Sequence, residues 1–217
     1  MDAVDQRLVA LAAQQHQVFS RAQARAAGLS ASSLSRRVAS GRLVACGTSA
    51  LNLPGVTLTY RGRLMAGLLD LGPEALVSGR AAAHLHGLDG FAEGPLEFLV
   101  PRQARGRATT GIVTSSHQIG RLDRTEIDGL ACTSATRTIV ELLHTATDDE
   151  VGNALDSATR HRRTAAAVVA KRLDELGRHR HGGAVLARLV RAGAVESWLE
   201  RRFVALARRA RLPVART

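Results

Sequence analysis

The sequence predicts an α+β protein with a helical N-terminal head, a small mixed α/β middle domain and C-terminal helices. Apolar residues recur at helical spacing in the first 40 residues and again after residue 58. Between the helical segments lie short apolar runs bounded by Gly, Pro or Ser, which is typical of strands. The net charge also changes sign twice along the chain. We therefore expect three domains, at residues 1–55, 56–160 and 161–217.

Composition limits the classes of protein to which the chain can belong. Of 217 residues, 45% are hydrophobic, enough for a folded core. The formal charge is +11, divided into +4 for residues 1–55, −4 for 56–159 and +11 for 160–217. Such a basic excess favours a polyanionic partner. No stretch of about 18 apolar residues is present and acidic residues come before any basic one, so we expect a cytoplasmic protein without a membrane partner.

The pattern of residues in the head predicts three helices. The first covers residues 2–16, and a short extended piece, Val18-Phe19, follows it. Ser20 caps a second helix that ends before Gly28, and Ser30 caps a third over residues 31–40. Only a three-residue turn containing Gly28 separates the second and third helices, which is typical of a helix-turn-helix.

A hairpin follows the third helix. Short apolar runs at residues 42–46 and 50–53 flank the turn Gly47-Thr48-Ser49, and Pro54-Gly55 ends the segment. Three helices and a hairpin within 55 residues predict a winged helix-turn-helix, with the third helix as the recognition helix.

The third helix has one apolar and one polar face. Leu34 and Val38 should point to the core, which leaves hydroxyls and arginine on the other side, with Arg37 at the edge. Hydroxyls suit phosphates, and arginine can read guanine through two hydrogen bonds. Ser20 and Arg21 at the start of the second helix, and Arg42 where the hairpin begins, are further candidates for phosphate contacts. The candidate DNA-binding residues are Ser20, Arg21, Ser32, Ser33, Arg36, Arg37, Ser40 and Arg42. The alternative is a small helical fold for protein contacts, with these side chains only solvated.

The middle domain alternates helical and extended patterns. Helices are expected at residues 58–71 and 81–86 and after Ser134, which should cap the last of them. Residues 75–77 form a short apolar run. Residues 96–100 and 112–114 are predicted strands, and Ile127-Asp128-Gly129-Leu130 is a predicted hairpin turn.

The residues give no support for enzymatic or metal chemistry. Cys46 and Cys132 lie far apart without a CxxC motif and read as buried hydrophobes. The pair His84 and His86 would point about 200° apart on a helix, and the pair His179 and His181 is equally weak. The sequence contains no Gly-rich phosphate loop, no GxSxG motif and no paired carboxylates with a credible base. We predict no catalytic residues, no metal and no cofactor.

Three segments together resemble the AbiEi-type antitoxin family of bacterial regulators. The first is Val18-Phe19-Ser20-Arg21-Ala22-Gln23-Ala24 with Gly28 and Gly41-Arg42-Leu43. The second is Val77-Ser78-Gly79-Arg80-Ala81-Ala82-Ala83-His84-Leu85-His86-Gly87-Leu88. The third is Thr133-Ser134-Ala135-Thr136-Arg137-Thr138-Ile139-Val140-Glu141-Leu142, with Glu141 where the family often has Asp. Residues 48–51 depart from the wing sequence that is more usual in the family.

The resemblance implies a DNA-binding repressor. In the family the N-terminal winged helix binds operator repeats at its own promoter, and many members pair with a nucleotidyltransferase-like toxin. The partners to expect are therefore double-stranded operator DNA and, where a toxin gene accompanies the regulator, a cognate toxin. A homodimer is a further expectation, because palindromic operators mirror two-fold proteins.

Part of the C-terminal tail, residues 161–217, resembles a different family. Residues 196–203 followed by Leu212-Pro213 look like the first helix of a very-short-patch-repair-like endonuclease domain. Glu196 alone cannot hold Mg²⁺, which needs several oxygen ligands, so the segment reads as a truncated remnant. Its apolar stripe is Trp198, Leu199, Phe203 and Leu206.

Three hypotheses of function follow. The first is a sequence-specific repressor that regulates its own operon. The second is an antitoxin module that binds a toxin through protein contacts. The third is a degenerate defence nuclease. Salt distinguishes the first two, because DNA binding weakens steeply as salt rises. Metal-dependent cleavage of plasmid DNA would indicate the third.

Overall fold

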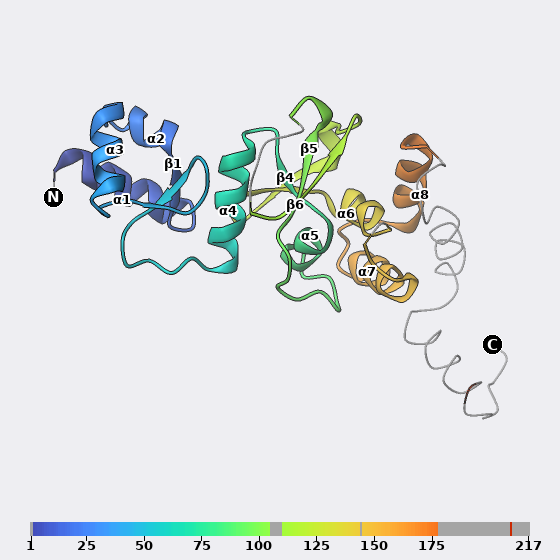
Figure 1. The fold of residues 1–217 in the computed structure, drawn as a ribbon. Helices are drawn as coiled ribbons and strands as arrows, with labels where there is room; N and C mark the ends of the chain where they lie inside the picture. The colour runs from blue at the N-terminus through green and yellow to red at the C-terminus, as the bar shows by residue number, and fades with distance from the viewer. Residues whose placement is uncertain (1, 105–109, 144, 178–208, 210–217) are drawn as a thin grey trace. The chain divides into compact units, whose positions relative to one another are not determined.

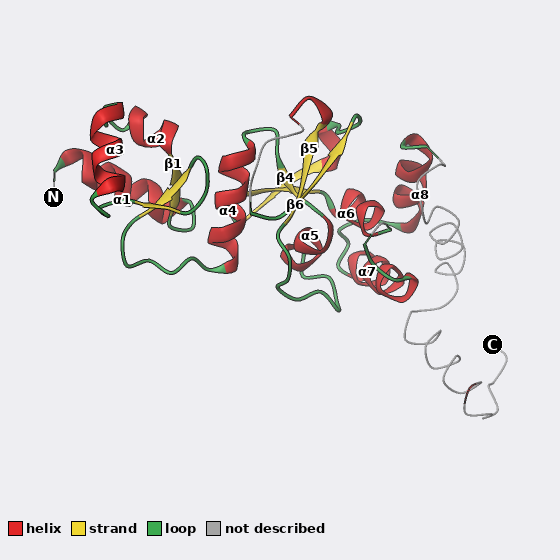
Figure 2. Cartoon of the chain, viewed as in Figure 1, coloured by secondary structure: helices red, strands yellow, loops and turns green. Residues whose placement is uncertain are grey.

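The computed structural model describes residues 2–104, 110–143, 145–177 and 209 (Figure 1). The chain forms two compact units. The first unit comprises Met1–Ala82 and Glu93–Ser134, and the second comprises Ala83–Ala92 and Ala135–Thr217. Figure 2 shows helices throughout and strands in the N-terminal and central regions. The predicted α+β class is confirmed.

The head of the first unit has the predicted order of elements. These are α1 (Ala3–Gln14), β1 (Val18–Ser20), α2 (Arg21–Ala26), α3 (Ala31–Ala39), β2 (Val44–Ala45) and β3 (Ala50–Asn52). The strands form an antiparallel sheet in the order β1-β3-β2. Ser20 and Ser30 are the N-caps of α2 and α3, as predicted. The β2–β3 hairpin lies at the predicted wing, with shorter strands than the apolar runs suggest.

One apolar cluster holds the three helices to the small sheet. Its buried members are Leu8, Ala12, Phe19, Ala24, Leu29, Leu34, Leu43 and Leu51. Gly28 forms the turn between α2 and α3 with a φ of +113°, a conformation that side chains with a Cβ rarely adopt. A Cβ at Gly28 would also lie 3.4 Å from Val4 Cγ2. The helix-turn-helix angle therefore depends on this glycine.

The rest of the first unit is built on a mixed sheet of five strands. Its elements are α4 (Tyr60–Leu71), β4 (Leu76–Val77), β5 (Glu97–Pro101), β6 (Ile112–Ser116), β7 (Arg124–Ile127) and β8 (Leu130–Thr133), with short 3₁₀ turns at Arg102–Ala104 and Arg121–Asp123. Helix α5 (Gly79–Leu85) begins in the first unit, and its last residues belong to the second, which starts at Ala83. The order is β6-β5-β4-β8-β7. Strand β4 pairs antiparallel with β5 and parallel with β8. The β7–β8 turn is the predicted hairpin, with Asp128 and Gly129 at positive φ.

Helix α4 packs directly on the sheet and also contacts β1 and β3 of the head. A Cβ at Gly67 would lie 2.2 Å from Phe98 Cζ, so only glycine permits this approach. Because α4 touches both sheets, it links the head to the mixed sheet within one compact unit.

The second unit is helical. It contains α6 (Ala135–Leu142), α7 (Asp148–Arg160) and α8 (Ala166–Glu175), with α6 in contact with both of the others. Helix α6 begins directly after Ser134, as predicted. In the part of the chain that the structure describes, no helix combines the length and apolarity needed to cross a membrane. The predicted tail stripe, Glu196 and the pair His179 and His181 lie outside the described residues.

Candidate nucleic-acid interface

Helix α3 buries one side and exposes the other. Leu34 is buried in the head cluster, and Val38 packs against it, as the helical spacing predicts. The Ser30 hydroxyl accepts a hydrogen bond from the Ser33 amide at 3.1 Å and fixes the start of the helix. The opposite side presents Ser32 and Arg36 to solvent. This face offers hydroxyl and guanidinium groups, the donors that suit phosphates and base edges.

The end of α3 continues this polar face. Ser40 is exposed, and its hydroxyl donates to the Arg37 carbonyl at 3.3 Å. Arg42, two residues later, is exposed at the start of the hairpin. Ser33 is half-buried beside the helix start. The structure therefore brings Ser32, Arg36, Ser40 and Arg42 to the surface of the head.

Two other candidates already have protein partners. Ser20 is buried, its hydroxyl accepts from the Gln23 amide at 3.1 Å, and the Gln23 side chain accepts from the Ser20 amide at 2.8 Å. This reciprocal capping box fixes the start of α2. Arg21 Nε donates to the Thr48 carbonyl at 3.2 Å and so ties α2 to the hairpin turn. A DNA contact by either side chain stays a prediction.

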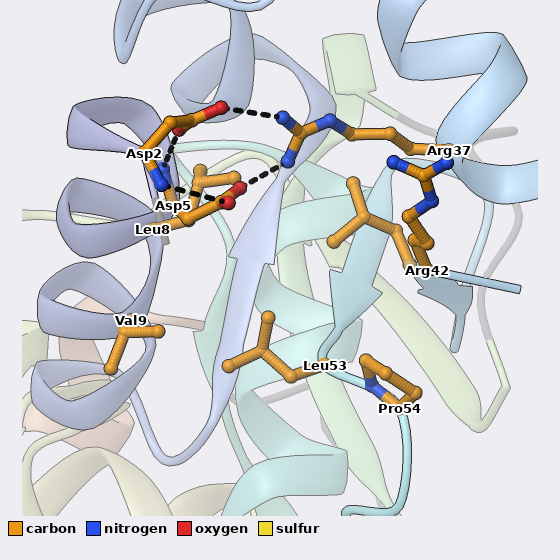
Figure 3. A pocket seen from close by; sticks show the side chains of 9 residues that line it. Asp2, Asp5, Leu8, Val9, Arg37, Arg42, Leu53 and Pro54 are labelled. Carbon is orange, nitrogen blue, oxygen red and sulfur yellow. Dashed lines mark hydrogen bonds and ion pairs between the residues drawn. The ribbon is translucent and has the colours of Figure 1, made fainter.

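Arg37 bridges two helices. Its guanidinium pairs with Asp5 through Nη1, and its Nη2 lies 3.3 Å from Asp2 Oδ2 (Figure 3). Both acids belong to the start of α1, where Asp2 is the N-cap and accepts from the amides of Val4 and Asp5. The Arg37 side chain is only 18% exposed. Arg37 therefore links α3 to the start of α1.

A cavity of about 340 Å³ lies beside this ion-pair cluster. Figure 3 shows the two carboxylates on one wall and the guanidiniums of Arg37 and Arg42 on the other. Its apolar lining consists of Leu8, Val9, Leu43, Leu53 and Pro54. Of the two arginines, Arg37 reaches across to the acids, and Arg42 is exposed at the rim.

The head keeps an excess of positive charge, because its acidic residues pair with Arg37 and leave the other arginines without an acidic partner among the described residues. In residues 2–55, all of which the structure describes, Asp2 and Asp5 are the only acids, and both pair with Arg37. The other five arginines of the segment are Arg7, Arg21, Arg25, Arg36 and Arg42. None of these five has an ion-pair partner in the described part of the chain. An uncompensated positive surface of this kind attracts a polyanion.

The Asp5–Arg37 pair predicts a pH dependence of head stability. The hydrogen bond from Arg37 is the main cause that lowers the pKa of Asp5 below its ordinary value. A lowered pKa in the folded state stabilises the fold above the unfolded-state pKa, and this contribution is lost as pH falls through the folded-state pKa. Asp5→Asn should therefore flatten the decline in melting temperature below about pH 4.

The measurement is thermal unfolding followed by circular dichroism between about pH 2 and pH 6. Glu126→Gln is the control, because Glu126 is an exposed acid of β7 for which the structure shows no side-chain partner. An Asp5→Asn protein whose acid transition equals that of wild type would contradict the role given to the pair.

Sequence reasoning missed several polar groups near the predicted face. Ser35 is exposed on α3 directly before Arg36, and Arg25 is exposed on α2. Thr48 is exposed in the hairpin turn. Helical periodicity places Ser35 at the edge of α3, about 60° around the helix from Val38, so it did not mark Ser35 as part of the polar face.

No metal centre emerges from the described residues. Among them, no group of three or more His, Cys, Asp or Glu side chains is arranged to hold an ion. His84 Nδ1 lies 3.3 Å from the Phe91 carbonyl, and His86 is buried. Cys132 is also buried, which raises the pKa of its thiol to about 12. At neutral pH that thiol is protonated.

Comparisons with known proteins bear on the head. The sequence matches none of the curated proteins. A crystal structure of the RV2827C protein from Mycobacterium tuberculosis is similar over 86% of this chain and 82% of that chain, with 17% identity and a TM-score of 0.43. A likeness this distant carries no conclusion about function. Neither comparison supports a nuclease fragment in the tail.

Residues 6–44 match a family model described as "Transcriptional regulator, AbiEi antitoxin". The matched segment includes most of α1, all of α2 and α3, and the first residue of β2. It therefore contains the complete helix-turn-helix and the polar face of α3. Over these residues the chain is similar to AbiEi antitoxin transcriptional regulators, the family that the sequence motifs indicate.

Proposed function

We propose that this chain is a sequence-specific DNA-binding transcription regulator that represses its own promoter, with α3 as the recognition helix. The observation that carries the proposal is the exposed face of α3, where Arg36 stands beside serine hydroxyls. This face lies within the segment that is similar to transcriptional regulators. The five arginines without acidic partners supply the long-range attraction to DNA.

In this mechanism α3 enters the major groove. Arg36 donates two hydrogen bonds to the O6 and N7 atoms of a guanine, which is the commonest specific contact in that groove. Ser32 donates to a flanking phosphate, and the Ser40 hydroxyl turns from the Arg37 carbonyl to donate to another. Arg42 neutralises a phosphate beside the hairpin. Arg37 contributes indirectly, because its pairs with Asp2 and Asp5 fix the angle of α3. Repression follows from occupation of the promoter.

Double-stranded operator DNA is the proposed partner. A homodimer would suit a palindromic site with half-sites about 34–36 Å apart. The alternative partner is a cognate toxin bound through protein contacts, as the antitoxin resemblance implies. These two classes of partner differ in their response to salt, because only DNA binding releases counterions from phosphates.

The test is a salt titration of binding to a duplex from the region upstream of the gene, followed by fluorescence anisotropy. Wild type should show a steep negative slope of log affinity against log salt. Arg42→Ala should make that slope shallower by about 0.9, the share of one phosphate contact. It should weaken binding to upstream and scrambled duplexes alike, because phosphates carry no sequence information.

Arg121→Ala is the charge-matched control. Arg121 is exposed, lies outside the head and has no side-chain partner in the described residues. Equal slopes of log affinity against log salt for wild type and Arg42→Ala would mean that Arg42 does not contact a phosphate. A wild-type affinity for the duplex that does not change with salt would overturn DNA binding as the function.

A further inference from the structure

A carboxylate from α4 binds the turn of the wing. We call residues 46–49, between β2 and β3, the wing turn. Asp70 Oδ2 accepts from the Thr48 amide at 3.1 Å. Its Oδ1 accepts from the amides of Ser49 at 2.6 Å and Ala50 at 3.0 Å. Three successive backbone N–H groups thus converge on one side chain that is 20 or more residues away in sequence.

The wing turn is shaped to receive this carboxylate. A Cβ at Gly47 would lie 2.2 Å from Asp70 Oδ2, so any side chain there would displace the carboxylate. The φ of Gly47 is not positive, which means that space alone requires glycine. On its other side the turn is held by Arg21 Nε, which donates to the Thr48 carbonyl at 3.2 Å.

We call the three hydrogen bonds from the amides of residues 48–50 to Asp70 the clasp. The clasp determines which groups of the wing can contact DNA. Hydrogen bonds from amides to an ionised carboxylate are about twice as strong as neutral ones. The three amides are occupied by Asp70 and are not available to a phosphate. The wing therefore offers DNA its exposed side chains, Thr48 in the turn and Arg42 at its start. A turn fixed before binding loses less conformational entropy when it contacts DNA.

We infer that Asp70 is a positioning residue for DNA binding, which holds the wing turn in the conformation that meets the DNA backbone. The inference rests on the proposed function. Charge alone predicts the opposite effect, because an acid near a DNA-binding surface repels phosphates. Removal of Asp70 therefore distinguishes positioning from electrostatics by the sign of the change in affinity.

The experiment compares Asp70→Asn, Gly47→Ala, the double variant and Glu126→Gln. Asp70→Asn removes the charge and the acceptor geometry, whereas Gly47→Ala keeps the charge and displaces the carboxylate. Glu126→Gln makes the same charge change as Asp70→Asn at an exposed position on β7. The readouts are affinity for the upstream duplex, amide hydrogen exchange at residues 48–50, and circular dichroism to confirm that each variant is folded.

Both single variants should bind about three- to tenfold more weakly, as expected when one or two side chains must be ordered on binding. Amide exchange at residues 48–50 should accelerate in both, and the double variant should lose no more affinity than either single one. Glu126→Gln should bind as well as wild type or more tightly.

Two results would overturn the inference while leaving the proposed function intact. The first is an Asp70→Asn protein that binds the upstream duplex as tightly as the Glu126→Gln protein does. The other is faster amide exchange in both variants with unchanged affinity, which would make the clasp purely structural. A folded wild-type protein that binds no duplex would overturn the proposed function and the positioning role together. In that case the exchange data would still show whether the clasp exists.

Discussion

Replacement of Arg36 by alanine is expected to weaken binding to the upstream duplex by about 1–3 kcal/mol, the contribution of one bidentate contact to a base. This corresponds to a loss of about 5- to 150-fold in affinity. The reason is local, because Arg36 is exposed on α3 and has no ion-pair partner in the described residues. Competition with unlabelled upstream and scrambled duplexes measures the effect.

The loss should be confined to the specific site. Arg36→Ala should bind the scrambled duplex nearly as well as wild type, whereas Arg42→Ala should weaken binding to both duplexes. Arg121→Ala removes the same charge from a site outside the head and should leave the ratio of the two affinities unchanged. An Arg36→Ala protein with wild-type affinity for the upstream duplex would mean that this face of α3 does not read DNA.

Replacement of Arg137 by alanine is expected to destabilise the second unit by about 3–5 kcal/mol, because it removes one charge of a buried ion pair. Arg137 is fully buried in α6, and its Nε donates to Glu141 Oε1 at 2.7 Å. The Glu141 side chain is only 10% exposed. Denaturant unfolding followed by circular dichroism measures the change in the free energy of unfolding.

An exposed pair in the same unit provides the control. Arg160 and Asp89 pair with both side chains about half exposed, so Arg160→Ala should lower stability by no more than about 1 kcal/mol. Arg137→Met combined with Glu141→Leu should be more stable than Arg137→Ala, because apolar side chains then replace both members of the ion pair. Equal small losses for Arg137→Ala and Arg160→Ala would contradict the role of the buried pair.

The order of elements in the head could be predicted because its signals are local. Ser20 and Ser30 precede helices whose apolar residues recur at helical spacing, and Gly28 marks the turn between them. The hairpin turn at Asp128 and Gly129 is equally local. Such signals involve residues within a few positions of each other, so a single sequence contains them.

Interactions between distant segments could not be predicted. Periodicity placed Arg37 at the edge of α3 but did not show that Asp2 and Asp5, more than 30 residues earlier, neutralise it. The clasp between Asp70 and the wing turn is hidden for the same reason. The strand order β6-β5-β4-β8-β7 likewise depends on pairings between distant segments.

The candidate site was predicted in part. The expected polar face agrees with the exposure of Ser32, Arg36, Ser40 and Arg42. Ser20 is instead buried, and its hydroxyl caps α2. The contacts of these residues with DNA stay predictions. The burial of Arg137 could not be predicted, because sequence pattern does not distinguish a buried arginine from a solvated one.

The central claim is that α3 reads a specific DNA sequence. The most direct measurement is fluorescence anisotropy of the wild-type protein on the upstream duplex and on a scrambled duplex of equal length and composition, at matched salt. We predict binding to the upstream duplex at least about 10³-fold tighter than to the scrambled one, the lower range for specific regulators. Equal affinity for the two duplexes would contradict sequence-specific recognition and leave only a nonspecific attraction to polyanions.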